Sequence, residues 1–468
     1  MSKNRFPASR ASAIRLGASF AAAAMLAGCS MIPELKLPAA PVPQQFANVP
    51  DSGIAPPSWR EYYADPALHA LIEAALEHNR DMRIALARVE EARALAGIAR
   101  ADRFPTLDAQ ASANRSRTPA DLSATGRART GSRYDLGLGV TSFELDFWGR
   151  VAALNEAALA QYLASGEAAK SFRVSLIGDV ADTWYQLTEL AERERLANDT
   201  LNSRRESLEL IRKRRDAGLA TELEVLAAES LAESVRGQWA ELKRQRMQTE
   251  NALRLLTGMA APLPATTALV NQPKLAAIAP GLPSEVLLKR PDVRAAEQRL
   301  VAANASIGAA RAAFFPRISL TGSFGTASSD LSGLFDSGSG AWLFNPVVKL
   351  PLFDAGRNQA NLDLAEARKT MAVADYEKTI QQAFREVADA LAALSTYGEQ
   401  LSAQQANLQA QQARLERVKA RAETGIASYL EVLDASREAF AAEQTLATTR
   451  RQALASQVAL FRALGGGE

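Results

Sequence analysis

The sequence predicts a protein of mixed α and β class that is internally duplicated, with one β-hairpin and very long coiled-coil α-helices in each copy. Two landmarks that occur twice predict this fold. Phe104-Pro105 and Phe315-Pro316 each open a stretch of alternating polar and apolar residues, and the stretches end at Gly149-Arg150 and Gly356-Arg357. The copies lie 211 residues apart before the hairpins and 207 after them, so the first hairpin is four residues longer. Such length differences belong in hairpin tips, and we interpret the repeat as structural.

The composition suits helices in close contact, because 47% of the 468 residues are hydrophobic and only 6% are aromatic. We therefore expect one body made of two similar halves rather than several domains. The formal net charge is +2. Without the first 28 residues, which contain four bases and no acids, 50 basic and 52 acidic residues remain and the balance becomes −2. This balance leaves no basic patch that would indicate a nucleic-acid partner.

The N-terminus has the pattern of an export signal. Basic residues come first, an apolar stretch from Leu16 to Leu26 follows, and Leu26-Ala27-Gly28 precedes Cys29. A small-residue site directly before Cys resembles the lipobox of bacterial lipoproteins, which implies that Cys29 becomes an acylated N-terminus. By the sorting rule of that family, Ser30 in place of Asp implies the outer membrane. An ordinary signal with an incidental Cys is the alternative. Cys29 is the only cysteine, so acylation leaves no thiol for a disulfide, a metal or a nucleophile.

The predicted boundaries follow from these landmarks and from proline-rich stretches. Residues 1–28 are the signal peptide, 29–64 the acylated N-terminus with a Pro-rich extended tether, and 261–284 an equatorial linker. The first repeat, 65–260, contains a helix from about Asp65-Pro66 to about Arg103, the hairpin 104–148, a rod 150–216 and a return helix 221–257. The second repeat, 285–468, contains a helix, the hairpin 315–355, a rod 357–423 and a return helix 428–464.

Each rod is 67 residues long, which corresponds to about 100 Å at 1.5 Å per residue. In the second rod, apolar residues recur at steps of seven, at Val373, Ile380, Val387, Leu394, Leu401, Leu408, Leu415 and Ala422. The first rod keeps the same register at Val180, Leu187, Leu201 and Leu208. A stripe of this kind predicts a coiled-coil seam.

Each rod ends at a glycine that begins a tight turn, Gly218 in the first copy and Gly425 in the second. Thr221 with Glu224, and Ser428 with Glu431, have the spacing of capping boxes, in which a hydroxyl and a glutamate satisfy free N–H groups at a helix start. The sequence therefore predicts that both rods fold back at a locally specified tip.

The hairpin strands are expected at 106–114 with 134–147, and at 317–326 with 342–353, and the tips at 118–132 and 328–340. Strands of nine or more residues with one apolar and one polar face match the wall of a membrane β-barrel around water. A half-buried sheet in a soluble protein is the alternative. The export pattern and the absence of an apolar run of about 18 residues after the signal favour the membrane.

Four strands cannot close a cylinder, and an open sheet edge in lipid leaves unpaired backbone groups that each cost several kcal/mol. Copies must therefore assemble until the edges meet. Eight strands leave an interior filled by side chains, so a lumen needs more than two chains. Three chains would supply 12 strands, although this argument also permits four.

The duplicated hairpins and rods, the Phe-Pro strand openings, the Gly-Leu and Gly-Ile tips with Leu-Glu-Val-Leu, and the lipobox together resemble the TolC/OprM-like outer-membrane factors, specifically the NodT-type efflux lipoproteins. The resemblance implies a trimeric 12-stranded β-barrel that continues as an α-helical barrel through the periplasm. It implies the exit duct of a tripartite efflux pump, which passively conducts small molecules or drugs. The implied partners are two further copies, outer-membrane lipid, a periplasmic adaptor and an inner-membrane transporter, usually proton-driven.

The resemblance also implies site residues. The tips that contact the adaptor correspond to Gly218, Leu219, Ala220 and Thr221, and to Gly425, Ile426, Ala427 and Ser428. The periplasmic gate corresponds to Glu224, Leu430, Glu431 and Asp434. Leu430 and Asp434 share a helix face, so a trimer would place an acidic ring beside an apolar one. Glu224 and Glu431 have a capping role to explain them. Some relatives carry a basic residue in the tip that pairs with these acids, and neither Ala220 nor Ala427 can do so.

An enzyme is the competing class, and the sequence offers it no catalytic, cofactor or metal site. His69 and His78 are nine residues apart without companion cysteines, and no Walker loop, GxSxG elbow or HExxH occurs. A non-conducting structural lipoprotein rod would explain the heptads and the anchor, but not two alternating hairpins. A duct for type I protein secretion also remains open, and the sequence does not identify the transported substrate.

Overall fold

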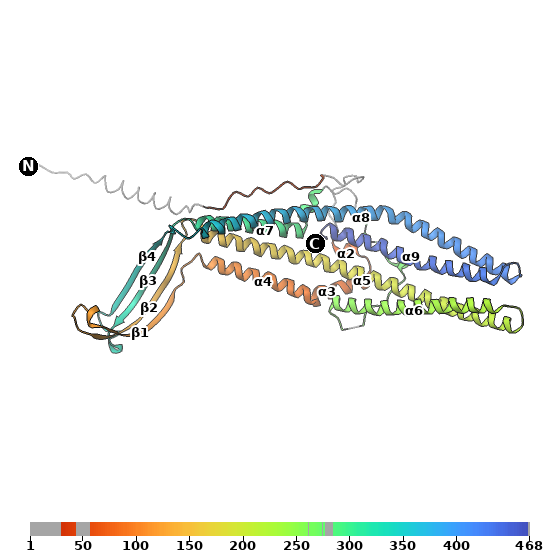
Figure 1. Cartoon of the computed structure of the whole chain (residues 1–468), viewed down its shortest axis with the longest axis horizontal. Coiled ribbons are helices and arrows are strands. Elements are labelled where there is room, and N and C mark those ends of the chain that lie inside the picture. Colours follow the sequence, from red (N-terminus) through yellow and green to blue (C-terminus); the bar gives the residue numbers. More distant parts are fainter. Residues whose placement is uncertain (1–29, 44–56, 261, 274, 277–283, 467–468) are drawn as a thin grey trace, which may run out of the picture. The chain divides into compact units, whose positions relative to one another are not determined.

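The computed structural model describes residues 30–43, 57–260, 262–273, 275–276 and 284–466 (Figure 1). The signal peptide and Cys29 therefore lie outside the described residues. The chain divides into two compact units. The first, which we call the hairpin unit, comprises Met1–Pro38, Val89–Ser165 and Ala296–Tyr376. The second, the helical unit, comprises Ala39–Arg88, Gly166–Ala295 and Glu377–Glu468.

The hairpin unit contains one antiparallel sheet in the order β1-β2-β3-β4 (Figure 1). The strands are β1 (Asp108–Thr118), β2 (Arg129–Leu145), β3 (Arg317–Ser328) and β4 (Gly340–Lys349). The predicted mixed class, with two hairpins and four strands, is confirmed. The predicted strand and tip bounds within the first hairpin were wrong, because Arg115–Thr118 continue β1 and pair with Arg129–Ser132. Backbone hydrogen bonds can extend a ladder through polar residues, so the alternating pattern underestimated this hairpin.

The register places apolar side chains of all four strands on one face of the sheet. Ala109 lies opposite Leu138, Leu138 opposite Phe324, and Phe324 opposite Trp342. Directly opposed residues share a face, so these four side chains form a row. Phe324 and Trp342 are 75% and 77% exposed. Between Val140 and Phe143 the β2–β3 register shifts by one residue at a bulge, where Ser142 has a φ of 53°. The bulge therefore lies on β2 and not on β3.

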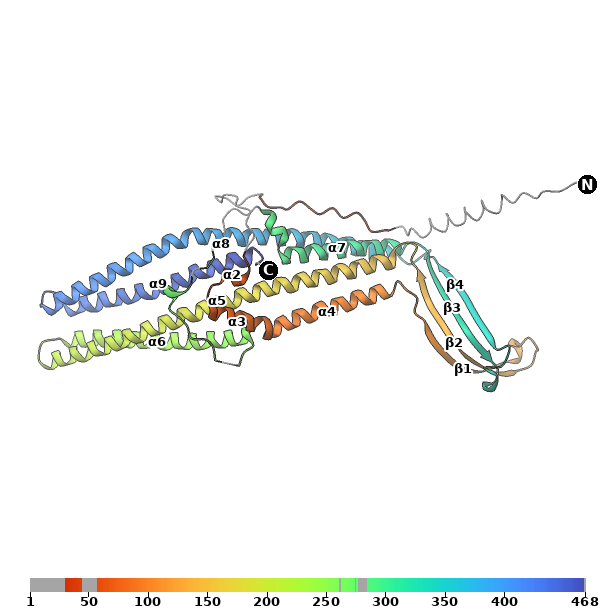
Figure 2. The same ribbon diagram turned by 180° about the vertical axis from the view of Figure 1, so that it is seen from behind.

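Two helices of 67 residues dominate the rest of the chain, α5 (Arg150–Asp216) and α8 (Arg357–Glu423). Each folds back at a tip turn into a return helix, α6 (Glu222–Thr257) and α9 (Tyr429–Ala463), as Figures 1 and 2 show. The remaining helices are α2 (Trp59–Tyr62), α3 (Pro66–His78), α4 (Arg80–Ala101) and α7 (Pro291–Ala312). Short 3-10 turns occur at Ala120–Leu122, Leu269–Asn271, Ser284–Lys289 and Leu331–Gly333. In the described ranges, no helix combines the length and apolar character needed to cross a membrane.

The main core of the helical unit contains an aromatic cluster at positions that were predicted to belong to the tether. Trp59, Tyr62 and Tyr63 are at most 1% exposed, and Tyr62 stacks on Phe461 with ring centroids 4.8 Å apart. Each large ring buries 150–250 Å² of surface, which outweighs the extended preference of the neighbouring prolines. The predicted tether 29–64 therefore ends earlier. Its N-terminal part also has contacts, because Asn304 on α7 donates to the carbonyl of Pro33 at 2.8 Å.

The helix that was predicted to run from Asp65-Pro66 to about Arg103 is interrupted at Asn79. Asn79 has a ψ of 131° and separates α3 from α4. Its Oδ1 accepts from the N–H of Met82 at 2.8 Å, and its Nδ2 donates to the carbonyl of Leu256 at 2.9 Å. The side chain thus caps the new helix and ties it to α6, which compensates for the broken ladder.

The heptad stripes of the two rods differ in burial. In α5, Val180, Leu187 and Leu201 are at most 3% exposed. They pack in clusters with α6 and α9 side chains such as Val235 and Phe440. In α8, Ile380 and Val387 are buried, whereas Leu394 is 38% exposed and the stripe positions from Leu401 to Ala422 are only partly buried. The single chain therefore leaves the second seam incompletely covered.

Candidate functional site

The first tip turn is built by backbone hydrogen bonds around Gly218. Its φ is +71°, a left-handed conformation that favours glycine. The N–H of Leu219 donates to the carbonyl of Arg214 at 2.7 Å, which closes the end of α5. At the start of α6, Thr221 N donates to Glu224 Oε2 at 2.7 Å and Glu224 N donates to Thr221 Oγ1 at 3.3 Å. The predicted capping box is confirmed.

The second tip repeats this geometry around Gly425, whose φ is +76°. The N–H of Ile426 donates to the carbonyl of Arg421 at 2.8 Å. Ser428 and Glu431 form the second capping box, with Ser428 N donating to Glu431 Oε1 at 3.0 Å. These hydrogen bonds from the backbone and the hydroxyl of Ser428 hold the pKa of Glu431 below its usual range. Both glutamates are therefore engaged in local structure.

Each tip presents one apolar side chain to solvent. Leu219 and Ile426 occupy equivalent positions and are both 69% exposed. Behind them, Ala220 packs with Tyr429 and Leu433 of α9 against a buried cluster formed by Leu208, Ile211, Val225 and Ala228. The two tips are thus joined by an apolar contact within the helical unit. Exposed apolar side chains on a rigid, capped turn are suited to contact another protein.

Asp434 lies in the second turn of α9 and is paired with arginines. Its Oδ2 accepts from Arg414 Nη2 on α8 at 2.9 Å, and its Oδ1 accepts from Arg437 Nη2 at 2.7 Å. Leu430, one turn earlier, is 40% exposed. Sequence reasoning identified Asp434 but missed both arginines. The Asp434-Arg437 spacing of three residues is a visible helical signal, whereas Arg414 requires knowledge of how α8 and α9 align.

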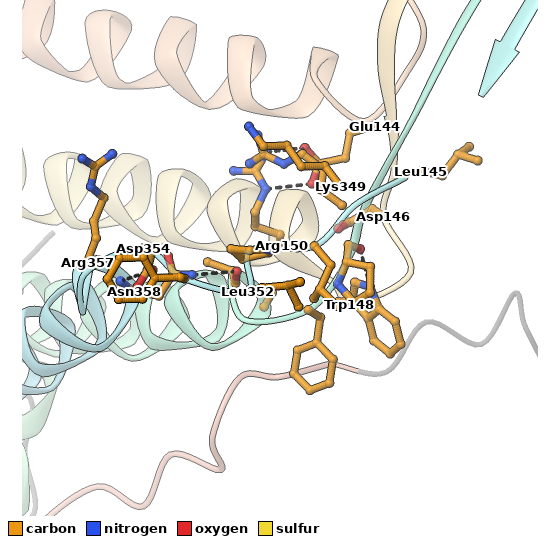
Figure 3. Close-up of a pocket in the computed structure, with 18 of the residues that line it drawn as sticks. Glu144, Leu145, Asp146, Trp148, Arg150, Lys349, Leu352, Asp354, Arg357 and Asn358 are labelled. Atoms are coloured by element: carbon orange, nitrogen blue, oxygen red, sulfur yellow. Dashed lines mark hydrogen bonds and ion pairs between the residues drawn. The ribbon is translucent and has the colours of Figure 1, made fainter. Parts of the chain in front are cut away.

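The hairpin unit has a second constellation where the strands meet the helices (Figure 3). A pocket of about 1060 Å³ is lined by residues from β2, β3, the end of β4 and the starts of α5 and α8. Glu144 receives two hydrogen bonds from Arg150, at 2.8 and 2.7 Å, and its Oε2 lies 3.1 Å from Arg317 Nε. Glu144 is thus the acidic centre of a three-residue ion network.

Near this network, each of the two repeats has an aspartate that caps the N-terminus of its long helix. Asp146 accepts from the N–H groups of Val151 and Ala152, at 3.0 and 2.7 Å. Asp354 accepts from the N–H groups of Gly356 and Asn358, at 3.0 and 2.9 Å. These carboxylates accept hydrogen bonds from free N–H groups at the N-termini of α5 and α8. Their negative charge also interacts favourably with the positive end of each helix dipole. They are capping groups rather than candidates for catalysis.

An aromatic pair connects the two repeats beside the pocket. Trp148 stacks on Phe315 with ring centroids 4.7 Å apart, and its indole N–H donates to the carbonyl of Pro316 at 2.8 Å. In the second copy, Leu352 and Phe353 are 89% and 91% exposed. Within the part of the chain that the structure describes, no three His, Cys, Asp or Glu residues gather in a way that could hold a metal ion.

These features define a class of protein. A duplicated chain with two strand hairpins, two 67-residue helices and capped tips has the architecture expected of an outer-membrane efflux channel. The family model of outer membrane efflux proteins matches residues 71–259 and 282–466. The chain belongs to this family. It is a transport protein of the outer membrane, and the predicted class, location and efflux function are confirmed.

Particular relatives agree with this assignment. The chain is 49% identical over 454 residues to the solvent efflux pump outer membrane protein SrpC of Pseudomonas putida, covering 95% of this chain and 96% of the relative. A solved membrane protein from Pseudomonas aeruginosa is 48% identical, with a TM-score of 0.89 over 94% of this chain and 98% of that one. The open state of the MtrE outer membrane channel of Neisseria gonorrhoeae is 38% identical, with a TM-score of 0.85 over 94% and 98%.

Proposed function

We propose that three copies of this chain form the exit duct of a tripartite efflux pump, with a 12-stranded β-barrel in the outer membrane and an α-helical barrel in the periplasm. The observation that carries this proposal is a four-stranded sheet with two free edges in an outer-membrane efflux protein. An edge in lipid leaves backbone groups unpaired at several kcal/mol each, so the edges must meet. Three copies supply the smallest barrel with room for a lumen.

The exposed parts of the chain support assembly. The row that contains Phe324 and Trp342 is apolar and exposed, as the lipid face of a barrel requires. The incompletely covered stripe of α8, from Leu394 to Ala422, is an apolar surface that neighbouring helices would cover. Both surfaces would cost free energy in an isolated, water-exposed protomer, because apolar area exposed to water costs roughly 25 cal/mol per Å².

The tips are the proposed contacts for a periplasmic adaptor. Gly218 to Thr221 and Gly425 to Ser428 present Leu219 and Ile426 on rigid turns, which suits an apolar helical partner. The adaptor would link the duct to an inner-membrane, energy-supplying transporter. The chain itself would act as a passive conduit without catalysis.

Glu224, Leu430, Glu431 and Asp434 are proposed to line the closed periplasmic aperture. Asp434 is the strongest member, because its pairing with Arg414 holds α9 against α8. Acids near a threefold axis would form a ring that favours cations. The ion pairs of Asp434 with Arg414 and Arg437 would stabilise the closed aperture within one chain. Ala220 and Ala427 in the tips cannot form such pairs.

Small apolar molecules are the proposed cargo, since a solvent efflux pump component shares 49% identity with this chain. Acylation of Cys29 is the proposed anchor. The lipid would hold the chain in the same membrane as the barrel. Cys29 directly precedes the described segment 30–43, in which the carbonyl of Pro33 accepts a hydrogen bond from Asn304 on α7.

Planar bilayer recordings of the purified protein, combined with its mass in detergent, test this proposal. We expect a trimer that inserts and conducts. A silent trimer would favour the structural rod, and a folded, soluble monomer would refute the proposal. In a strain that lacks the gene, expression of this protein from a plasmid should restore tolerance to an organic solvent. Restored secretion of a protein without restored tolerance would favour the secretion duct.

A further inference from the structure

The internal duplication specifies how neighbouring copies align at the sheet edges. The chain pairs β2 of its first copy with β3 of its second, and a closed ring must pair β4 of one chain with β1 of the next. These two junctions are equivalent by duplication, because each joins the end of one repeat to the start of the following one. The register of the visible junction therefore predicts the register of the seam. This inference rests on the proposed trimer.

One anchor lies near the hairpin tips. Ala113 pairs with Tyr134, and its counterpart 211 residues later, Phe324, pairs with Trp342, so Trp342 is the structural counterpart of Tyr134. Tyr134 in turn pairs with Ser328, whose counterpart in β1 is Arg117. The duplication therefore places Trp342 opposite Arg117 of the neighbouring copy.

A second anchor lies at the other end of the strands, beyond the bulge at Ser142. Leu145 pairs with Ile318, and their counterparts are Leu352 and Leu107. Ten residues separate Trp342 from Leu352, and ten separate Leu107 from Arg117. The two anchors therefore belong to one continuous antiparallel register. The β2 bulge has no counterpart between the two anchors in β4.

The side-chain faces agree with this register independently. The row Ala109-Leu138-Phe324-Trp342 places Trp342 on the same face as the odd-numbered residues of β1. A slip of one residue would put Trp342 opposite Ser116 or Thr118, on the polar face. The duplication then selects among the registers that keep the faces matched.

We propose that β4 of one copy pairs with β1 of the next in the register that sets Trp342 opposite Arg117, Val348 opposite Ala111 and Leu352 opposite Leu107. Leu107 and Leu352, 67% and 89% exposed in the single chain, then cover each other. Towards the tips, Arg115 and Arg117 lie beside the rings of Phe344 and Trp342, where a guanidinium is attracted to an aromatic face.

Engineered cysteine pairs in the full-length chain test the register. Val348→Cys with Ala111→Cys should give covalent multimers up to the trimer after oxidation, because opposed strand residues meet disulfide geometry. Within one chain these positions are separated by three strand spacings, about 14 Å, across the sheet and by eight residues along it, so they cannot link to each other. Val348→Cys with Ala109→Cys or Ala113→Cys, shifted by two residues, should not link.

The in-chain pair Ile318→Cys with Val348→Cys, which are directly opposed in β3 and β4, is the positive control and should link without forming multimers. Single-cysteine variants account for any reaction of Cys29. Linking of a shifted pair instead of Val348-Ala111, or linking of none while the in-chain control reacts, would overturn the register. The mass before oxidation separates the two proposals: an intact trimer leaves the assembly standing, whereas a monomer removes both.

Discussion

Arg414 on α8 donates to Asp434 on α9 across the second tip hairpin, with Nη2 and Oδ2 2.9 Å apart. Arg414 precedes Gly425 by eleven residues and Asp434 follows it by nine, so the pair lies at one level of the hairpin. Arg437 binds the same carboxylate at 2.7 Å from within α9. Asp434 thus forms two ion pairs, one with Arg437 within α9 and one with Arg414 that joins α9 to α8.

Asp434→Ala should raise the conductance of the closed protein in planar bilayers, by roughly twofold or more, because it removes an acid from the proposed aperture and the link between α8 and α9. Arg414→Ala, which removes only the cross-helix pair, should act in the same direction. Arg437→Ala is the matched control for the local pair and should act less. Unchanged conductance of Asp434→Ala would exclude this residue from the gate.

Gly425→Ala should destabilise the second tip by about 1–2 kcal/mol, because a side chain strains the left-handed conformation at φ +76°. Gly398→Ala, within α8 and with open space around its Cα, should instead stabilise the helix by up to about 1 kcal/mol. Thermal unfolding in detergent measures both. Equal midpoints for the two variants would contradict the requirement for glycine in the turn.

Leu219→Ser combined with Ile426→Ser should reduce solvent tolerance in cells, while membrane levels and bilayer conductance stay unchanged. The reason is that both side chains are 69% exposed and contribute to the proposed adaptor contact rather than to the core. Leu255→Ser on α6, where the side chain is 79% exposed, is the control. A tolerance loss of equal size in the control would argue against a specific contact at the tips.

Glu144→Gln should destabilise the hairpin unit by about 1–3 kcal/mol, because Arg150 and Arg317 lose a shared carboxylate that is only 17% exposed. Asp135→Asn on the same strand breaks a pair with the largely exposed Arg133 and should cost less than about 1 kcal/mol. The temperature at which the folded band disappears on an electrophoretic gel compares the variants. A smaller effect at Glu144 than at Asp135 would contradict the assigned role of the network.

Asp182 predicts a pH dependence of stability. Burial raises its pKa to about 6 from 3.8, while Arg462 and Arg451 oppose this rise and Asp179 adds to it. Its Oδ1 is buried, and no hydrogen-bond partner for it occurs among the described residues. Between about pH 4 and 6 the folded protein binds a proton that the unfolded chain has lost, so stability should fall as the pH rises through this window.

Asp182→Asn should therefore unfold at a higher temperature than the parent above pH 6, and the difference should vanish near pH 4. Because 38% of the side chain is exposed, water screens the effect, and we expect about 1 kcal/mol. Asp389→Asn, at a 75% exposed position, is the control and should show no such dependence. A difference that is constant from pH 4 to 8 would contradict the assignment to Asp182.

Local patterns were sufficient to predict much of this fold. The Gly-Arg pairs, the heptads and the capping boxes at Thr221 and Ser428 each depend on residues within a few turns of one another, and the structure has long helices and tips at these positions. The alternating hairpins were recognised for the same reason. The residues of the proposed gate came from the family resemblance, and their role remains a prediction.

Contacts between distant segments could not be predicted in this way. The break at Asn79 depends on the carbonyl of Leu256, and the core position of Trp59 depends on a buried cluster that includes Trp184 and Phe461. Arg414 was missed because only the aligned hairpin brings it to Asp434. The bulge at Ser142 carries no composition signal, although it decides which residues of β2 and β3 meet.

The unequal burial of the two heptad stripes has a genetic consequence. Leu201 in α5 is covered within its own chain, so a polar substitution there should prevent folding of the mutant polypeptide alone and behave as recessive. Leu394 in α8 is 38% exposed, and a polar substitution there should leave a subunit that still folds. This subunit should assemble with wild-type subunits in the proposed trimer and inactivate it. Such an allele should be dominant when it is expressed together with the wild-type gene.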